Sequence, residues 1–288
     1  MTARPAPIVL VAHGSRDPRA AVATRALARA VAAARPGLLV RASYLDHSRP
    51  RPAAVLTELE AAGHRRAVMV PLLLTAAYHG RVDIPEAIAS ARAGGLRMAV
   101  RVADVLGPTE VVGSGDVVGA GERGADELLL AGLWRRLAEA GSPVATSEGV
   151  PGGVDAVVLA AAGTRDATAR RTVDLVAEAL GATLGVPSLV AYASAAPPGP
   201  GVAVARLRAD GARRVAVATY FLAYGRLYEA AMESARSAGA VALAAPLGDA
   251  PELARLVLAR AAAAAPGRVL SIREQTALFD FGGAKTGA

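Results

Sequence analysis

The chain has 288 residues, and 32 lysine and arginine residues against 25 aspartate and glutamate residues give it a formal net charge of +7. It contains no cysteine, which excludes disulfide scaffolds, cysteine-ligated zinc, iron–sulfur clusters and thiol nucleophiles, so any metal must be held by histidine, carboxylate or water. The hydrophobic fraction of 53% is ample for packed cores, and the length favours two domains of about 100–150 residues.

The first half of the chain alternates short apolar runs with helical stretches. Residues 8–12 are predicted to form a buried strand, and Asp17 and Pro18 then provide the N-cap and first residue of a helix that continues to about residue 34. Asp83, with the Ile-Pro-Glu that follows it, has the pattern of a capping box before another helix. The other strands are expected at 38–45, 67–74 and 98–103, and the other helices at 52–62, 87–92 and 126–140.

The chain also contains an internal duplication. IVLVAHGSRD at 8–17 resembles VVLAAAGTRD at 157–166, and RRAVMVPLLL at 65–74 resembles RRVAVATYFL at 213–222. The two matches occur in the same order and at nearly the same offset, which alanine-rich composition alone does not explain. The sequence therefore indicates two homologous halves.

Repeated alternation of strands and helices is typical of parallel sheets covered on both faces. We predict an α/β fold with two homologous, doubly wound parallel-sheet lobes of about four strands each, facing a central cleft. The N-terminal lobe is expected over 1–141, a Gly/Pro-rich linker over 142–154, a degenerate C-terminal lobe over 155–265 and an irregular tail over 266–288.

Three side chains are predicted to meet at the carboxyl edge of the first sheet, where ligands of open parallel sheets bind. His13 follows the first strand by one residue, Asp46 follows the second by one residue, and His79 lies in the loop after the third. Two imidazoles and a carboxylate suit a borderline divalent ion such as Fe²⁺, Co²⁺ or Zn²⁺, and they also suit acid–base catalysis. Each residue alone also fits an ordinary loop or capping position, so the hypothesis depends on their convergence.

Further polar residues surround this edge. Ser15 and Arg16 stand where the first helix begins, where they either cap the helix or bind an anion together with backbone N–H groups. The other two histidines, His47 and His64, are interpreted as surface loop residues. More arginines gather near the same loops, although solvated surface positions are the more common explanation in an arginine-rich chain: Arg19, Arg49, Arg51 and Arg81.

The segments VAHGSRDP and VPLLLTAAYHGRVDIPEAI resemble the sirohydrochlorin chelatase family of the class II tetrapyrrole chelatases. That family has an HGSRxP-type loop after its first strand, a proline-containing strand, a histidine-containing loop and an Asp-Ile-Pro helix start. The spacing of His13 and His79 also fits. The resemblance covers the whole first half and, more weakly, the second, in keeping with the two-lobed, single-chain form of the family.

The resemblance implies insertion of Co²⁺ or Fe²⁺, as a substrate metal and without an organic cofactor, into the carboxylate-rich tetrapyrrole sirohydrochlorin. It implies that His13 and His79 bind the metal and help to accept the pyrrole protons. The family often has glutamate where this chain has Asp46, which would be the third catalytic residue. Contacts with the substrate are implied for Ser15, Arg16, Tyr78 and Arg81.

The second half lacks all three candidate site residues. Ala162 stands in place of His13, Ser194 falls opposite Asp46, and the loop after residue 222 has no histidine. One active centre per chain is therefore expected, with the second half forming the opposite cleft wall. Aromatic residues near that wall suit a flat macrocycle, although each also suits ordinary packing: Tyr192, Tyr220, Phe221, Tyr224 and Tyr228.

Two other classes of protein compete with this interpretation. A histidine phosphatase also uses a histidine at a strand end, but it carries arginine where this chain has Ala12. A non-catalytic two-lobed protein that binds metal or tetrapyrrole would have the same sequence features as the enzyme.

Nucleic acid and membranes are not expected as partners. No basic stripe is interleaved with aromatic residues, and the uncharged run 179–205 is broken by glycine and proline. The positive charge fits a substrate ringed with carboxylates. The start of the chain lacks a signal-peptide pattern, so we expect a cytoplasmic protein, and a monomer would suffice because the two lobes are fused.

Overall fold

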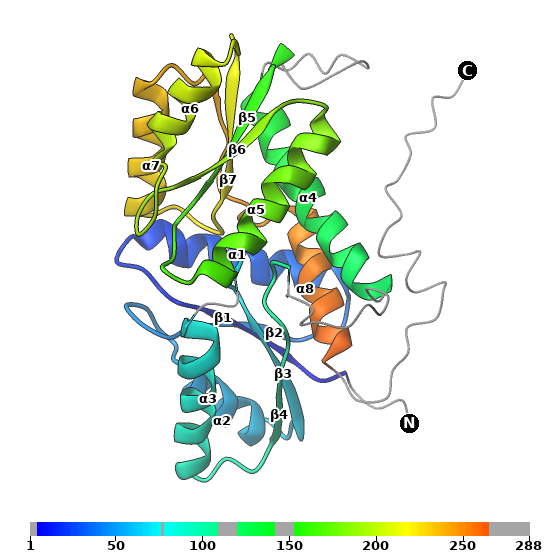
Figure 1. Ribbon diagram of the computed structural model, residues 1–288. Helices are drawn as coiled ribbons and strands as arrows, with labels where there is room; N and C mark the ends of the chain where they lie inside the picture. Colours follow the sequence, from blue (N-terminus) through cyan, green and yellow to red (C-terminus); the bar gives the residue numbers. More distant parts are fainter. Residues whose placement is uncertain (1–4, 76–77, 109–119, 142–152, 265–288) are drawn as a thin grey trace, which may run out of the picture.

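The computed structural model describes residues 5–75, 78–108, 120–141 and 153–264 and places them in two α/β lobes (Figure 1). The first lobe is built on a parallel sheet with the strand order β2-β1-β3-β4. Its strands are β1 (Ile8–Ala12), β2 (Val40–Tyr44), β3 (Arg66–Pro71) and β4 (Ala99–Val102).

The second lobe repeats this topology. Its sheet has the order β6-β5-β7-β8, and all three strand pairs are parallel. Its strands are β5 (Ala156–Ala161), β6 (Ser188–Tyr192), β7 (Val215–Tyr220) and β8 (Ala242–Leu243). The predicted pair of homologous, doubly wound parallel-sheet lobes is thus confirmed.

Eight helices within the described residues connect and cover these strands, and no helix there has the length and apolar character needed to cross a bilayer. In the first half they are α1 (Pro18–Ala34), α2 (Pro52–Ala61), α3 (Tyr78–Ala93) and α4 (Ala120–Ala140). In the second half they are α5 (Ala167–Leu184), α6 (Pro200–Ala209), α7 (Arg226–Ser237) and α8 (Pro251–Ala263).

Helix α1 begins where the sequence predicts. The Asp17 carboxylate accepts the backbone N–H of Arg19 at 2.9 Å, and Pro18 occupies the first helical position. Leu27, Ala28 and Val31 are buried at helical spacing, so α1 has one apolar face.

Helix α3 begins earlier than predicted. The sequence places the helix start after Asp83, whereas the helix extends back to Tyr78 and contains Pro85 in its interior. Proline inside a helix loses one backbone hydrogen bond and crowds the preceding turn, and burial of Ile84 against the outer face of the sheet compensates for this cost. His79 therefore lies in the first turn of a helix, and its predicted location in a loop was wrong.

Alternate residues of β1 face two different apolar clusters. Ile8 and Leu10 belong to a cluster that continues into the second lobe, whereas Val9 and Val11 pack with α2 and α3 on the outer face. A third cluster lies between the second sheet and helices α6 and α7. The cluster between the lobes includes residues of α1, α4, α5 and α8, so the two lobes share one core.

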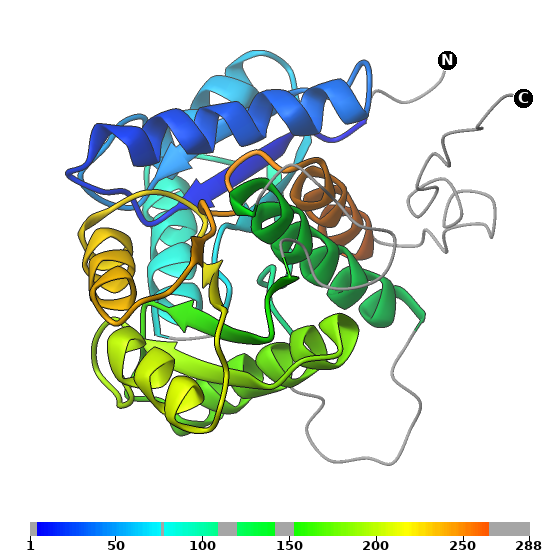
Figure 2. The ribbon, with the colours of Figure 1, turned by 90° about the horizontal axis from the view of Figure 1, so that it is seen from above.

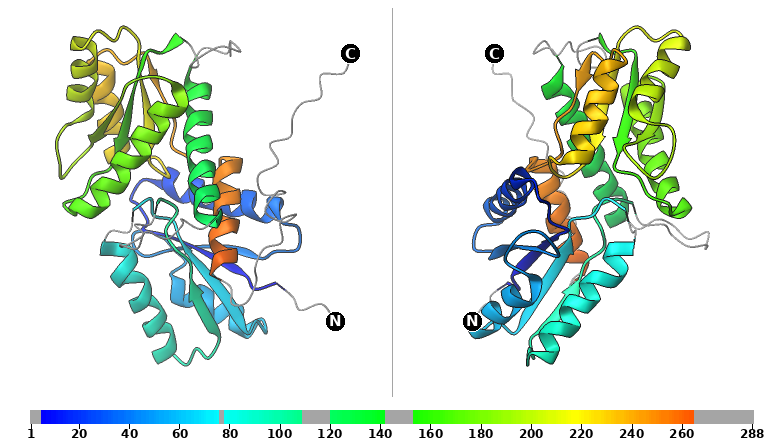
Figure 3. Two further views of the ribbon diagram at one scale, coloured as in Figure 1. Left: turned by 45° about the vertical axis from the view of Figure 1, so that its right-hand side comes forward. Right: turned by 90° about the vertical axis from the view of Figure 1, so that its left-hand side faces the viewer.

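The last helix of each half packs on the sheet of the other half. Helix α4 contacts β7, β8 and α5 of the second lobe, and α8 contacts β3 and α1 of the first lobe. Figures 2 and 3 show α4 and α8 side by side. The residue limits of the two lobes stay a prediction, but the packing shows that neither sheet is covered by its own half of the sequence alone.

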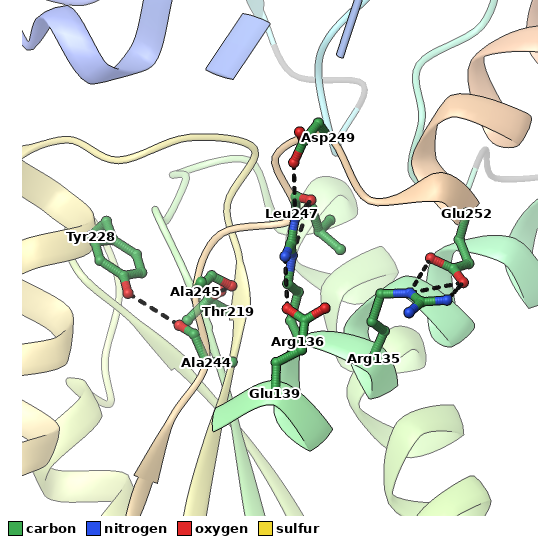
Figure 4. Close-up of polar contacts among 10 residues, drawn as sticks. All are labelled: Arg135, Arg136, Glu139, Thr219, Tyr228, Ala244, Ala245, Leu247, Asp249 and Glu252. Atoms are coloured by element: carbon green, nitrogen blue, oxygen red, sulfur yellow. Dashed lines mark hydrogen bonds and ion pairs between the residues drawn. The ribbon is translucent and has the colours of Figure 1, made fainter. Parts of the chain in front are cut away.

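Polar contacts tie α4 to the start of α8 (Figure 4). The guanidinium of Arg135 binds the carboxylate of Glu252, with Nη2 2.7 Å from Oε1, and the Glu252 residue is 3% exposed. The neighbouring Arg136 donates from Nη2 to the carbonyl oxygen of Leu247 at 3.0 Å. Burial raises the pKa of Glu252, but the hydrogen bonds from Arg135, a backbone hydrogen bond at Glu252 and the charges of Arg135 and Arg255 together outweigh it and leave the pKa below its ordinary value.

Candidate functional site in the cleft between the lobes

His13 lies in the cleft between the two lobes, one residue after β1. It lines a pocket of about 200 Å³ between the end of β1, helix α1 and the loop after β7, where Leu222 and Tyr224 form the opposite wall. It also lines a pocket of about 330 Å³ between the carboxyl ends of the two sheets, opposite Tyr220 and Phe221. His13 thus stands where both pockets meet.

The loop after β1 is held against the loop after β2. The backbone N–H of Asp46 donates to the carbonyl oxygen of His13 at 2.7 Å. Gly14 has a φ of +95°, and a Cβ at this position would lie 1.8 Å from the carbonyl oxygen of Asp46. Only glycine allows this approach, which brings the backbones of His13 and Asp46 together.

The carboxylate of Asp46 is directed to its own loop. Oδ1 accepts the backbone N–H of His47 at 2.7 Å, Oδ2 lies 3.4 Å from Nε2 of His47, and Nη2 of Arg51 lies 3.5 Å from Oδ1. The hydrogen bond from the His47 backbone and the nearby positive groups hold the pKa of Asp46 below its ordinary value. The side chain is 53% exposed, so an ionised carboxylate remains in contact with solvent at the cleft edge.

Ser15 and Arg16 follow His13 at the start of α1. The Oγ of Ser15 accepts the backbone N–H of Asp17 at 3.1 Å and lines the smaller pocket. The N-terminal donor at Arg19 is already occupied by the Asp17 carboxylate, which leaves less of the helix terminus for an anion than the sequence suggested. Arg16 is exposed.

The remaining predicted site residues are Tyr78, His79 and Arg81. Their backbone begins α3, but their side chains lie outside the described residues, so their roles stay predictions. Among the side chains that the structure describes, no group of three histidine, aspartate or glutamate residues is positioned to hold a metal.

The family of the chain is established by its sequence. Residues 7–114 and 156–264 each match the model of the CbiX family, one match for each lobe. The chain belongs to the CbiX family. Among functionally curated proteins, none matches this CbiX sequence.

Solved structures share the CbiX fold of this chain. SirB from Bacillus subtilis with Fe³⁺, and the sirohydrochlorin chelatase SirB from B. subtilis subspecies spizizenii in complex with cobalt, each superpose with a TM-score of 0.67 at 20% identity. Each match covers 88% of this chain and 93% of the other. CbiX, the terminal enzyme for biosynthesis of siroheme in denitrifying bacteria, gives a TM-score of 0.58 at 20% identity, with 91% and 100% of the two chains covered.

The second CbiX repeat keeps the scaffold of the candidate site without its candidate residues. Gly163 has a φ of +99°, and a Cβ there would lie 1.9 Å from the carbonyl oxygen of Ser194, as Gly14 approaches Asp46 in the first repeat. The Oγ of Ser194 donates to the carbonyl oxygen of Ala162 at 2.8 Å. This geometry confirms the predicted alignment of the repeats and the replacement of His13 by Ala162.

The aromatic residues of the second repeat divide between the cleft and the core. Tyr192, Tyr220 and Phe221 line the larger pocket, and Tyr224 lines the smaller one. Tyr228 is buried behind them, donates to the carbonyl oxygen of Ala244 at 3.1 Å and contacts the edges of Phe221 and Tyr224. Burial raises the pKa of Tyr192 and Tyr228 to about 12, so both stay neutral near neutral pH.

One contact across the cleft was not predicted. Arg19 at the start of α1 forms an ion pair of 2.8 Å with Glu229 of α7, and its guanidinium lies 5.1 Å from the ring centroid of Tyr224. The sequence shows Arg19 near the site loops but gives no sign that α7 lies opposite α1. Only the relative placement of the two CbiX repeats reveals the pair.

Proposed function

We propose that this CbiX family member is a sirohydrochlorin chelatase that inserts Co²⁺ or Fe²⁺ into sirohydrochlorin. The observation that carries the proposal is the position of His13, at the junction of two pockets between the lobes. The family match over both repeats and the same fold in SirB support it. In this proposal the protein is a lyase-type enzyme of cobalamin or sirohaem biosynthesis.

The chemistry requires a weak ligand that is also a base. Insertion breaks two pyrrole N–H bonds, forms the metal–nitrogen bonds and releases two protons for each divalent ion. Neutral imidazole binds such ions and accepts protons, and it releases the metal more readily than a cage of thiolates would. We assign both tasks to His13 and His79, with the ionised Asp46 stabilising positive charge at the cleft edge.

The cleft walls suit a macrocycle with an apolar face and a charged rim. Leucine and aromatic side chains of the second lobe face His13 across the larger pocket, where the ring would lie. Ser15, Arg16, Tyr78 and Arg81 are proposed to contact the peripheral carboxylates. One chain contributes both walls, so we propose a monomer as the active unit; its cytoplasmic location stays a prediction from the sequence.

The proposal is tested by following metal insertion into sirohydrochlorin by absorbance under anaerobic conditions, with Co²⁺ and Fe²⁺ compared. His13→Ala and His79→Ala are each expected to lower kcat/KM by about 10²-fold or more, as for the loss of a catalytic base. His64→Gln is the matched control, because His64 lies at the opposite end of the sheet, before β3; its interpretation as a surface residue was wrong, since it is 9% exposed. Insertion at the wild-type rate by both alanine variants would contradict the assignment, and binding without insertion by the wild type would indicate a carrier protein.

A further inference from the structure

Another pocket lies outside the cleft, along the exposed edge of the first sheet. It has a volume of about 420 Å³ and is formed by α1, the edge strand β2, the loop that follows β2, and α2. Four arginines and one carboxylate contribute its charged groups, and we call it the arginine pocket: Arg25, Arg29, Arg41, Arg49 and Glu58.

The positive charges of the arginine pocket are not neutralised within the fold. In the part of the chain that the structure describes, none of its four guanidinium groups is within ion-pair or hydrogen-bond distance of a carboxylate. Arg25 and Arg29 are separated by one helical turn, a spacing at which like charges repel. Four arginines and one glutamate give the pocket a formal charge of +3, and all four arginines are exposed, so their guanidinium groups are open to an anion from solvent.

The second lobe shows that the scaffold does not need these arginines. The alignment that matches Gly14 with Gly163 places Asp174 and Glu178 at the positions of Arg25 and Arg29 on the equivalent helix. At the other three positions, the strand register and the following loop place an uncharged residue or one of opposite charge: Leu189 for Arg41, Pro197 for Arg49 and Arg206 for Glu58. The formal charge of this set is −1, so the arginine pocket is a property of the first lobe alone.

We propose that the arginine pocket binds a compact polyanion with three or more negative charges, carried by phosphate or carboxylate groups. Guanidinium groups bind both kinds of oxyanion through paired, charge-assisted hydrogen bonds. The volume lies within the range of sites for small ligands, about 300–1,000 Å³. Tyr44 lines both this pocket and the smaller cleft pocket, so the bound anion lies next to the cleft but outside it. The site does not depend on whether the protein inserts metal.

The experiment uses the full chain without metal or tetrapyrrole, and isothermal titration with inorganic tripolyphosphate and with tricarballylate as probes. The ionic strength is kept constant with sodium chloride, because nonspecific attraction to a basic surface is screened by salt. One saturable site per chain is expected for at least one probe. Tighter binding of tripolyphosphate assigns phosphate groups to the ligand, and tighter binding of tricarballylate assigns carboxylates.

The decisive variants exchange residues between the two lobes. R25D/R29E and R41L introduce the residues that the second lobe carries at these positions, so the scaffold is expected to accept them. We expect R25D/R29E to weaken probe binding roughly tenfold or more, and R41L to weaken it about fivefold, because each change removes charge-assisted contacts. Metal insertion by R25D/R29E should remain at the wild-type rate.

R92Q/R97Q is the matched control, because it removes two exposed arginines of the same lobe that do not line the pocket. Its affinity for the probe should stay within about twofold of the wild type, in line with the small effect of distant, screened charges. Failure of the wild type to bind either probe saturably would overturn the proposal. Equal weakening in R92Q/R97Q, or loss of binding in Arg16→Gln but not in R25D/R29E, would also overturn it.

Discussion

Gly14 follows His13 and packs closely against the backbone of the loop that carries Asp46. Its φ of +95° is in the left-handed region, and the position of its missing Cβ is filled by the backbone of the neighbouring loop. The same arrangement recurs at Gly163 in the second repeat, where no proposed catalytic residue depends on it. The glycine is therefore a requirement of the scaffold, and His13 stands on a turn that the fold already needs.

We expect Gly14→Ala to destabilise the protein by about 2–4 kcal/mol, because it combines an unfavourable φ with a backbone clash. Gly37→Ala is the matched control: Gly37 has a φ of +82°, but a Cβ added there would meet nothing within 4 Å, so only the conformational cost of about 1–2 kcal/mol remains. Urea denaturation of both variants measures the difference. Equal losses of stability would show that the close approach to Asp46 contributes nothing.

The backbone positions of His13 and Asp46 were predictable, but the direction of the Asp46 side chain was not, and His79 was placed in a loop instead of a helix. The carboxyl ends of parallel strands share one edge, so strand prediction alone places His13 and Asp46 together. The orientation of the Asp46 carboxylate depends on the conformation of its loop, in which His47 has a φ of +53° and Arg51 turns back to the carbonyl oxygen of Leu45. Short-range sequence patterns contain no information on such a loop.

At the scale of elements, buried ion pairs and exposed ion pairs differ in what they contribute. Glu252, at the start of α8, is almost fully buried, whereas its partner Arg135 on α4 keeps 43% of its side chain exposed. On α7, Arg236 and Glu233 form a pair of 2.5 Å that is exposed on both sides. The buried carboxylate has lost its hydration and depends on its partner, while the exposed pair exchanges readily with water.

We expect Glu252→Gln to lower the free energy of unfolding by about 1–3 kcal/mol at neutral pH, less than for a fully buried pair because Arg135 reaches solvent. Since the pKa of Glu252 is lowered from 4.5, its contribution is present above that pH and is lost as the pH falls through the folded-state value. The variant should therefore lose less stability than the wild type between neutral and acidic pH. Glu233→Gln should change stability by less than about 1 kcal/mol; denaturation at a series of pH values compares the three proteins.

Most elements of the sequence-based prediction were confirmed, and the main error at this scale has a physical cause. The start of α1 was found because Asp17 and Pro18 are specific to helix termini. The start of α3 was misplaced because the same kind of pattern, at Asp83 to Glu86, occurs inside a longer helix whose buried Ile84 holds it in place. Tertiary packing outweighed a local signal.

At the scale of the whole molecule, the core shared by the lobes should make unfolding a single event. The apolar cluster that includes α1, α4, α5 and α8 continues from one sheet to the other, so loss of one lobe would expose the inner face of its partner. The sequence predicted the duplication and the cleft. It did not reveal that α4 and α8 each pack on the sheet of the other half, because their apolar faces would fit either sheet.

We expect Leu129→Ala, which removes a 1% exposed side chain of α4, to lower stability by about 2–5 kcal/mol and to shift one common transition. Fluorescence of Trp134, the single tryptophan, reports on α4, and circular dichroism reports on both lobes. The two signals should change at the same denaturant concentration in the wild type and in the variant. Two separated transitions in either protein would contradict a shared core.

Because α4 and α8 each pack on the sheet of the other half, the order of synthesis on the ribosome determines when each sheet is covered. When the first half has emerged, its sheet still lacks α8, which ends at Ala263, and α4 has no sheet to cover until β7 and β8 are made. Apolar surface on the first sheet and on α4 therefore stays uncovered until nearly all of the described chain has been translated. The lobe that carries His13 is synthesised first and completed last.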